Sequence, residues 1–434
     1  MRILLSILAI FSLCGAAAQP AETSYGRERP RGALLVYPTQ QEATAADGGD
    51  NRYFVRITDW LREESRFTTP FTVPFAWANR QVLLHVGEAS SDYEVLVNGK
   101  TVAYDSDGEN PADFNITRYV REGRNTLDLV LKNPSPVAPL ESWKQPSAPR
   151  IGSVWIMSQP TMRVRDVLVR TWFGDEDRSA ATAEVAVVVK SEALNPRTSR
   201  IHCELLTPAG ERAAGGVEEV TLDMRREDTV RFLARIPTNL LWSTDLPTQY
   251  TLRLKTQHEG RFVEYLEMRL GFRTVGVRDG RLEVNGAPVT LRAAEVPARI
   301  GEADIARLRE QGYNALRLEP GSVWPDLYDI CDRLGIYAIV QAPVDTSASG
   351  DSRRREGNPS NDPAWTAFVA ERIEDSYHTT KRHPSVIAFS LADKSSNGIC
   401  LYESYLKMKR FGDDRPFIYP DSGGEWNNDP LTIE

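Results

Sequence analysis

Several acidic side chains follow directly after predicted β-strands in the last third of the sequence. Glu295, Glu319, Asp345 and Glu425 fall at or just beyond the ends of such strands. The carboxyl ends of parallel strands form one face, where barrel enzymes keep their sites. Two carboxyl groups held in different environments can serve as a general acid and as a base or nucleophile. The alternative is that these groups are solvated loop carboxylates.

Four further residues near strand ends could contribute charge to the same face. Asp393 and Lys394 are adjacent and follow another predicted strand. Their side chains fit either a role in chemistry or a simple ion pair with each other. Arg292 and Arg317 lie on two neighbouring predicted strands. They fit either contacts to a ligand or buried ion pairs with nearby carboxylates.

The composition excludes some classes of function. The chain has 434 residues and a formal net charge of −8, without an extended basic run, so we expect no nucleic-acid partner. Its five histidines are scattered and no cysteine spacing fits a zinc site, so we expect neither a metal nor another cofactor. Cys331 falls on the apolar face of a predicted helix and is expected to pack in the core.

The first residues are typical of an export signal. Arg2 precedes an apolar run over residues 3–13, and three alanines follow at 16–18. The run is too short to span a bilayer, whereas a positive start, an apolar centre and small residues are typical of a signal peptide. We therefore predict a signal peptide over residues 1–18 and a periplasmic or secreted protein. No later stretch is apolar enough to span a membrane.

Short β-runs broken by turn residues extend from about residue 53 to 274. The clearest runs cover residues 82–86, 93–97, 127–131, 184–190 and 250–255. Asn98 and Gly99 directly follow one of them and form a strong β-hairpin signal. Since no long helical periodicity lies between the runs, they predict two antiparallel β-sandwiches in series, over residues 19–165 and 166–274.

After Thr274 the pattern changes to strands that alternate with helices. The expected strands cover residues 289–292, 314–318, 336–340, 385–391 and 417–419. The expected helices cover residues 302–311, 324–334, 363–377 (after a cap by Asp362) and 401–409. Repeated β-then-α units predict an α/β domain with a parallel sheet over residues 275–434. We count about five units, where a closed barrel of this kind needs eight.

Seven short motifs appear in a fixed order along the chain. They are VLVNGK at 95–100, DFNIT at 113–117, GRNTL at 123–127, LWS at 241–243, GFR at 271–273, NGAP at 285–288 and HPSVI at 383–387. Together they resemble glycoside hydrolase family 2, the β-galactosidase and β-glucuronidase family. The resemblance implies a jelly-roll-like sugar-binding sandwich, an immunoglobulin-like sandwich and a partial TIM-like barrel.

The resemblance also assigns positions in the cleft. The family's acid/base glutamate, in an S-L-G-N-E-S motif on the fourth barrel strand, corresponds to Lys394, and the preceding asparagine corresponds to Asp393. Arg292 and Arg317 match arginines that the family has. The family's nucleophile lies on the seventh strand, whereas this sequence stops after about the fifth. A lysine needs strong desolvation to exchange protons near neutral pH, so we expect no catalytic residue here.

Four tryptophans could offer flat faces to a sugar ring, namely Trp155, Trp242, Trp324 and Trp365. Trp324 and Trp365 fall on apolar helix faces, where core packing is the simpler interpretation.

Three hypotheses remain open. We favour an exported family member that has lost hydrolase chemistry and binds glycan or protein. Its cleft would be formed by Arg292, Glu295, Arg317, Glu319, Asp393, Lys394 and Glu425. The first alternative is an active β-glycosidase with a displaced carboxylate pair. The second is that a protein partner covers the open edges of the partial barrel, or that a premature stop has shortened the reading frame.

Overall fold

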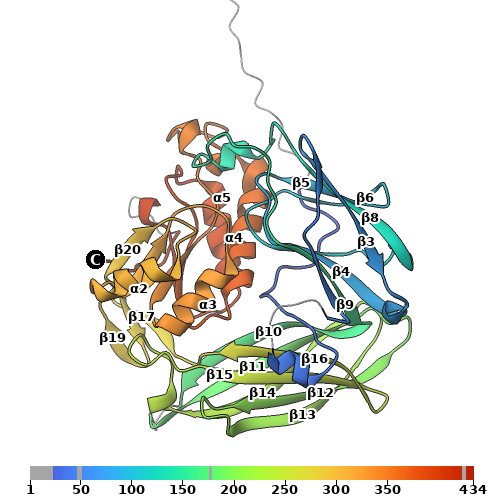
Figure 1. Cartoon of the computed structure of the whole chain (residues 1–434). Coiled ribbons are helices and arrows are strands. Elements are labelled where there is room, and N and C mark those ends of the chain that lie inside the picture. Colours follow the sequence, from blue (N-terminus) through green and yellow to red (C-terminus); the bar gives the residue numbers. More distant parts are fainter. Residues whose placement is uncertain (1–22, 46–50, 175–177, 423–426) are drawn as a thin grey trace, which may run out of the picture.

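The computed structural model describes residues 23–45, 51–174, 178–422 and 427–434. They form two β-sandwiches and an α/β unit, and the second sandwich lies beneath the other two in Figure 1. The signal peptide predicted over residues 1–18 lies outside the described residues. Within the described part of the chain, no helix combines the length and the apolar character needed to cross a membrane.

The first sandwich packs two antiparallel sheets face to face. Their strand orders are β1-β9-β4-β7 and β2-β3-β8-β5-β6. The strands are β1 (Phe54–Ile57), β2 (Leu61–Glu63), β3 (Arg66–Val73), β4 (Arg80–Val86), β5 (Tyr93–Val97), β6 (Lys100–Asp105), β7 (Ala112–Asn115), β8 (Gly123–Leu131) and β9 (Val154–Pro160). Asn98 and Gly99 join β5 to β6 with φ of 52° and 76°, a tight turn that their residue types permit.

The second sandwich also has two antiparallel sheets, with the orders β10-β11-β14 and β13-β12-β15-β16. The strands are β10 (Met162–Phe173), β11 (Ala180–Ser191), β12 (Arg197–Leu206), β13 (Arg212–Leu222), β14 (Glu227–Pro237), β15 (Tyr250–His258) and β16 (Arg261–Leu270). A short helix that the sequence did not suggest, α1 (Gln40–Ala45), lies against β16, where Gln40 donates to Glu267.

The α/β unit has a parallel sheet in the order β20-β21-β22-β23-β24, which confirms the predicted fold class. Its strands are β20 (Ala293–Val296), β21 (Ala315–Leu318), β22 (Tyr337–Gln341), β23 (Val386–Ser390) and β24 (Phe417–Ile418). Its helices are α2 (Glu302–Glu310), α3 (Pro325–Leu334), α4 (Thr366–Thr380) and α5 (Ile399–Lys409). Asp362 caps a short 3₁₀ turn, η6 (Pro363–Trp365), that leads into α4.

The first parallel strand begins later than the sequence suggested. The strand expected at residues 289–292 is wrong, because Val289 ends an antiparallel strand and parallel pairing starts at Ala293. The antiparallel sheet consists of β17 (Val275–Arg278), β18 (Arg281–Val284) and β19 (Ala287–Val289). Both stretches are short and β-prone, so only the available pairing partners decide which of them joins the parallel sheet.

The two faces of the parallel sheet have different coverings. Leu316 belongs to the apolar core that the sheet shares with the helices, and Cys331 is buried in the same core, as predicted. On the opposite face, Ile339 packs with Trp242 and with Leu282 of β18. The central strands are therefore apolar on both sides, as expected for a parallel sheet.

Residues 427–434 return along the sheet and hydrogen-bond to both of its edge strands. The amide of Asp429 donates to the carbonyl of Phe417 on β24 at 2.7 Å, and the amide of Ala293 on β20 donates to the carbonyl of Glu434 at 3.1 Å. This segment thus satisfies part of the backbone at the edges for which the sequence suggested a protein partner.

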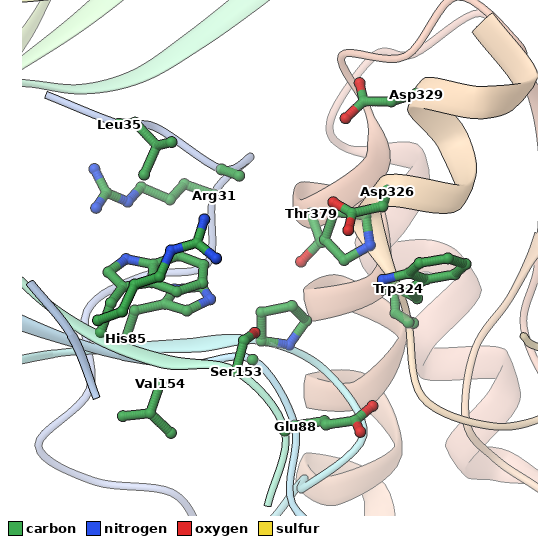
Figure 2. A pocket seen from close by; sticks show the side chains of 18 of the residues that line it. Arg31, Leu35, His85, Glu88, Ser153, Val154, Trp324, Asp326, Asp329 and Thr379 are labelled. Carbon is green, nitrogen blue, oxygen red and sulfur yellow. The ribbon is translucent and has the colours of Figure 1, made fainter. Parts of the chain in front are cut away.

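A cavity of about 1160 Å³ lies where the three units meet (Figure 2). Arg31 and His85 lie on one wall, and Asp326 of α3 and Thr379 of α4 lie on the opposite wall. Among the described residues, none of the cleft residues expected from the sequence lines this cavity.

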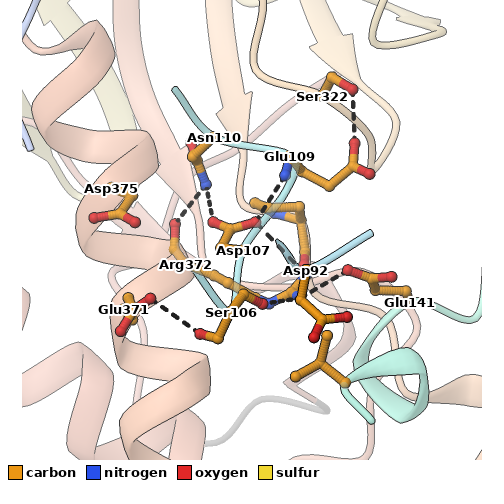
Figure 3. A network of polar contacts seen from close by, with 12 residues as sticks. Asp92, Ser106, Asp107, Glu109, Asn110, Glu141, Ser322, Glu371, Arg372 and Asp375 are labelled. Carbon is orange, nitrogen blue, oxygen red and sulfur yellow. Dashed lines mark hydrogen bonds and ion pairs between the residues drawn. The ribbon is translucent and has the colours of Figure 1, made fainter. Parts of the chain in front are cut away.

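Arg372 on α4 is the centre of a buried polar network between the first sandwich and the α/β unit (Figure 3). Its side chain is 1 % exposed. The guanidinium donates to Oε1 of Glu141 at 2.7 Å and to the carbonyls of Ser106 and Pro343 at 3.1 and 2.9 Å. Burial opposes its charge, but the Glu141 and Asp107 carboxylates overcome this and raise the pKa of Arg372.

Arg27 makes a second buried attachment of α4 to the first sandwich. Its Nη1 lies 3.2 Å from Oδ1 of Asp105 and 2.9 Å from Oε1 of Glu371, and its Nη2 lies 2.5 Å from Oδ2 of Asp375. Burial raises the pKa of Asp105 to about 7, although the Arg27 charge acts in the opposite direction. Two guanidinium groups therefore fix α4 against the sandwich.

Replacing Arg372 by methionine is expected to lower the free energy of unfolding by about 3–5 kcal/mol. The substitution keeps most of the side-chain volume but leaves the buried Glu141 carboxylate without one of its cations. Urea unfolding followed by circular dichroism measures the change. Arg355→Met, at a side chain that is exposed, is the matched control and is expected to change stability by less than about 0.5 kcal/mol. Equal stability of the two variants would contradict the network's assigned role.

Asp105 is expected to make stability depend on pH. Its pKa is about 7 in the folded protein but close to an ordinary aspartate in the unfolded chain, so the folded state binds an extra proton between about pH 4 and pH 7. Stability from this group is therefore greatest at about pH 4 and falls as the pH rises through 7. Asparagine does not titrate, so Asp105→Asn should lose this pH dependence. The difference in stability between the variant and the parent protein should therefore shift in favour of the variant as the pH rises from about 4 to 7. Unfolding midpoints at several pH values measure it. The exposed Asp223→Asn should show no such trend.

Candidate functional site

The candidate site is the carboxyl end of the parallel sheet, here called the mouth. Glu295 of β20 and Arg317 of β21 are register partners on adjacent strands, and Arg317 Nη1 lies 3.0 Å from Glu295 Oε1. The Glu295 side chain is exposed and Arg317 is partly buried. The two sequence candidates therefore form a partly solvated ion pair at the mouth, which contributes little to stability.

The next two strands bring Asp345 and Asp393 together. Asp345 follows β22, Asp393 follows β23, and their backbones pair as an isolated parallel bridge. Asp345 pairs on its other side with Glu141 of the first sandwich, and its amide donates to the carbonyl of Leu140 at 2.8 Å. The mouth is thus built by two units, because a loop of the first sandwich extends the row of strand ends.

Asp393 is a mouth residue whose carboxyl group has a perturbed pKa. Burial raises its pKa, and the nearby Asp345 and Asp421 carboxylates act in the same direction. The Lys394 and Arg317 cations oppose this shift. A carboxyl group with a raised pKa is the kind that can hold a proton for general acid chemistry.

Lys394 extends into solvent at the mouth. Its side chain is 72 % exposed, and its Nζ lies 3.5 Å from Oδ2 of Asp393. The residue has a positive φ of 42°, and its amide donates to Oδ2 of Asp421 at 2.9 Å. The backbone is therefore held by Asp421 in a conformation that few non-glycine residues adopt.

The structure does not place all the expected cleft residues beside Asp393 and Lys394. Glu319 is exposed just after β21, where its amide donates to the carbonyl of Val296. Arg292 precedes β20 at the opposite end of the sheet, and its guanidinium lies 5.1 Å from the ring centre of Tyr313. The expectation that Arg292 lines the cleft is therefore corrected. Glu425 lies outside the described residues.

Asp421 is the mouth residue that sequence reasoning did not select. It lies in the 3₁₀ turn η7 (Pro420–Ser422) that follows β24, and it holds the backbone of Lys394. Asp421, like the other carboxylates, lies just beyond a predicted strand, so the same sequence signal could have identified it. The contribution of Leu140 had no such signal, because it comes from a different unit.

One group of side chains in the described residues has the chemistry to hold a metal ion. Single ligand atoms of Asp329, Asp332 and His383 lie within 4.8 Å of one another. Asp332 already accepts from Nδ1 of His383 at 2.7 Å and from the amide of Ser385 at 2.9 Å. These bonds tie α3 to the start of β23, so a structural role accounts for the group without a metal.

Three family models match the chain. Residues 60–146 match "Glycosyl hydrolases family 2, sugar binding domain", residues 162–273 match "Glycosyl hydrolases family 2", and residues 278–432 match "Glycosyl hydrolases family 2, TIM barrel domain". The three units are thus those of a family of carbohydrate-active proteins. The chain belongs to glycoside hydrolase family 2, which confirms the resemblance drawn from its motifs.

The relatives include a β-galactosidase of Yersinia pestis bv. Antiqua (strain Angola). It is 26 % identical over 399 residues, which cover 85 % of this chain but 37 % of that protein. A β-galactosidase of Yersinia pseudotuberculosis serotype O:1b is equally similar, with 36 % of its length covered. The chain therefore spans little more than a third of the length of these relatives.

Solved structures show the same fold. A glycosyl hydrolase family 2 member from Bacteroides cellulosilyticus aligns with a TM-score of 0.67 at 18 % identity, over 82 % of this chain and 50 % of that one. A β-glucuronidase of Bacteroides uniformis aligns with a TM-score of 0.64 at 18 % identity, over 75 % of this chain and 40 % of that one.

The contact between Asp393 and Lys394 predicts how the pKa of Asp393 responds to a substitution. Lys394→Met should raise the pKa of the Asp393 carboxyl further, because the variant removes a cation that opposes the effect of burial. Carbon NMR titration of the carboxyl groups, assigned by comparison with Asp393→Asn, measures the shift. Lys407→Met on α5, which loses an ion pair with Glu374, should leave the pKa of Asp393 unchanged. A lower pKa in Lys394→Met would refute the pairing.

Proposed function

We propose that this protein is exported and binds glycan or protein through its family 2 architecture without hydrolysing O-glycosyl bonds. The periplasmic or secreted location rests on the signal peptide predicted over residues 1–18. Carbohydrate binding is supported by the match of residues 60–146 to the family's sugar-binding domain. The mouth and the first sandwich are the two surfaces that this function would use.

The proposed loss of hydrolysis rests on one observation, namely that Lys394 is a lysine whose side chain is exposed to solvent. Retaining glycosidases need one carboxyl group that protonates the leaving oxygen and a second, about 5–5.5 Å away, that attacks the sugar. The position that the family resemblance assigns to the first group holds an amine. An amine exchanges protons near neutral pH only when strongly desolvated, and the Lys394 side chain is 72 % exposed.

A second candidate function is supported by Asp393. Its raised pKa and its position beside Asp345 and Asp421 are features of a carboxyl group that could act as an acid. In this alternative the protein is a β-glycosidase of the β-galactosidase or β-glucuronidase type with a displaced carboxylate pair. Asp345 and Asp421 are both committed to backbone amides, of Ser347 and Lys394, which favours a structural role for them.

The proposed function predicts that pure protein releases no nitrophenol from aryl β-galactosides or β-glucuronides between pH 4 and pH 9. A glycan array run on the same preparation should show binding to at least one class of carbohydrate. Together these two measurements separate a binding protein from a hydrolase.

The same assay identifies the alternative if turnover is found. Turnover that falls about a hundredfold or more in Asp393→Asn, with a bell-shaped pH profile, would establish the displaced carboxylate pair. Turnover abolished by Lys394→Ala or Glu319→Gln would also overturn the proposed loss of hydrolysis. Arg200→Gln, an exposed side chain on β12 of the second sandwich, serves as the control for purity and folding.

A further inference from the structure

The cavity between the three units is distinct from the mouth. Its lining comes from β1, β4 and β9 of the first sandwich, from β16 of the second and from α3 and α4 of the α/β unit. Its volume of about 1160 Å³ exceeds that of most drug-sized sites and is sufficient for a short oligosaccharide. Ligand sites are found preferentially at such junctions between domains.

The cavity has polar groups that the protein itself does not satisfy. The Thr379 side chain is 2 % exposed, its hydroxyl has no hydrogen-bond partner among the described residues, and the side chain points into the cavity in Figure 2. Nη1 of Arg382 and the indole nitrogen of Trp155, two other lining residues, are also buried without a partner in the described chain. Buried polar groups of this kind are normally paired, so they indicate a ligand or ordered water in the cavity.

The charge of the lining favours an anion. Six arginines and four carboxylates line the cavity among the described residues. Three of the six arginines already have carboxylate partners: Arg31 and Arg333 pair with Asp113 and Glu302, which lie outside the lining, and Arg299 pairs with Glu88. The Arg382 guanidinium donates from Nη2 to the carbonyl of Ala33 and makes no ion pair within the described chain. Positive charge in a cleft of a protein with a net charge of −8 concentrates anionic ligands there.

Two aromatic side chains add a preference for a ring-shaped ligand. Trp155 on β9 lines the cavity from the first sandwich, and Trp324, directly before α3, lines it from the α/β unit. Both side chains are only partly buried. Trp155 stacks on His85 with ring centres 3.7 Å apart, which fixes its orientation. An amphipathic ring can pack on such surfaces while its polar groups meet the donors around it.

We propose that this cavity binds an acidic oligosaccharide, whose carboxylate or sulfate oxygens accept hydrogen bonds from Arg382 and Thr379. This proposal rests on the proposed carbohydrate-binding function. It names the class of carbohydrate and a binding site separate from the mouth. Both unpartnered groups are donors toward such a ligand, and a carboxylate or sulfate oxygen accepts from a guanidinium more strongly than a neutral sugar hydroxyl does.

Isothermal titration calorimetry of the full chain tests the proposal with four probes. These are tetragalacturonate, a neutral galactose tetrasaccharide, a sulfated galactose tetrasaccharide and inorganic sulfate. We expect one or both acidic tetrasaccharides to bind about tenfold or more tightly than the neutral one, with an affinity that falls as salt is raised. The two acidic probes distinguish carboxylate from sulfate as the preferred group.

Variants locate the binding site. Thr379→Val keeps the side-chain shape and Arg382→Gln removes the charge, and each should weaken binding of the preferred acidic probe about fivefold or more. Arg355→Gln should bind like the parent protein. Melting temperatures of all variants are compared first, and Arg382→Lys, which keeps a charge but not the fork geometry, replaces Arg382→Gln if the latter is unfolded.

Several results would overturn the inference. Equal affinity for acidic and neutral probes, unchanged binding in both cavity variants, or no binding of any probe would each exclude an acidic-sugar site in the cavity and leave ordered water as its content. Binding of acidic probes that is lost in Arg317→Gln alone would place the ligand at the mouth instead. Failure of the proposed function has a different signature, namely release of nitrophenol in the aryl-glycoside assay.

Discussion

The buried guanidinium of Arg372 connects the two units that build the mouth. Arg372 donates to the carbonyl of Pro343, two residues after the end of β22, and to the Glu141 carboxylate on the loop of the first sandwich. A buried arginine is tolerated only where carboxylates compensate its charge. Because Glu141 also pairs through its backbone with Asp345, this electrostatic requirement fixes one side of the mouth.

The consequence is a site whose charged side chains are positioned in part by another unit. The first sandwich holds Asp345 in place, Asp345 lies beside Asp393, and burial there raises the pKa of the Asp393 carboxyl. Lys394 compensates part of this effect from the solvent side. Burial and the neighbouring cation therefore act on the pKa of Asp393 in opposite directions.

The mouth and the cavity divide the polar surface of the molecule into two environments. The mouth is rich in carboxylates and partly solvated, whereas the cavity has an excess of arginine and is lined by aromatic rings. Different units meet at each place, so the packing of the sandwiches against the α/β unit determines both.

The sequence by itself determined the fold class of the units and the alternation of strands with helices after Thr274, because strand alternation, helical spacing and caps are local patterns. It also determined the family, through motifs such as HPSVI at residues 383–387, and the adjacency of Asp393 and Lys394. Only the tertiary structure decided that Arg292 lies away from the mouth, that residues 289–292 do not form the first parallel strand, and that Arg372 meets Glu141. Those outcomes depend on partners distant in the chain, and burial of charge acts only once the units have packed together.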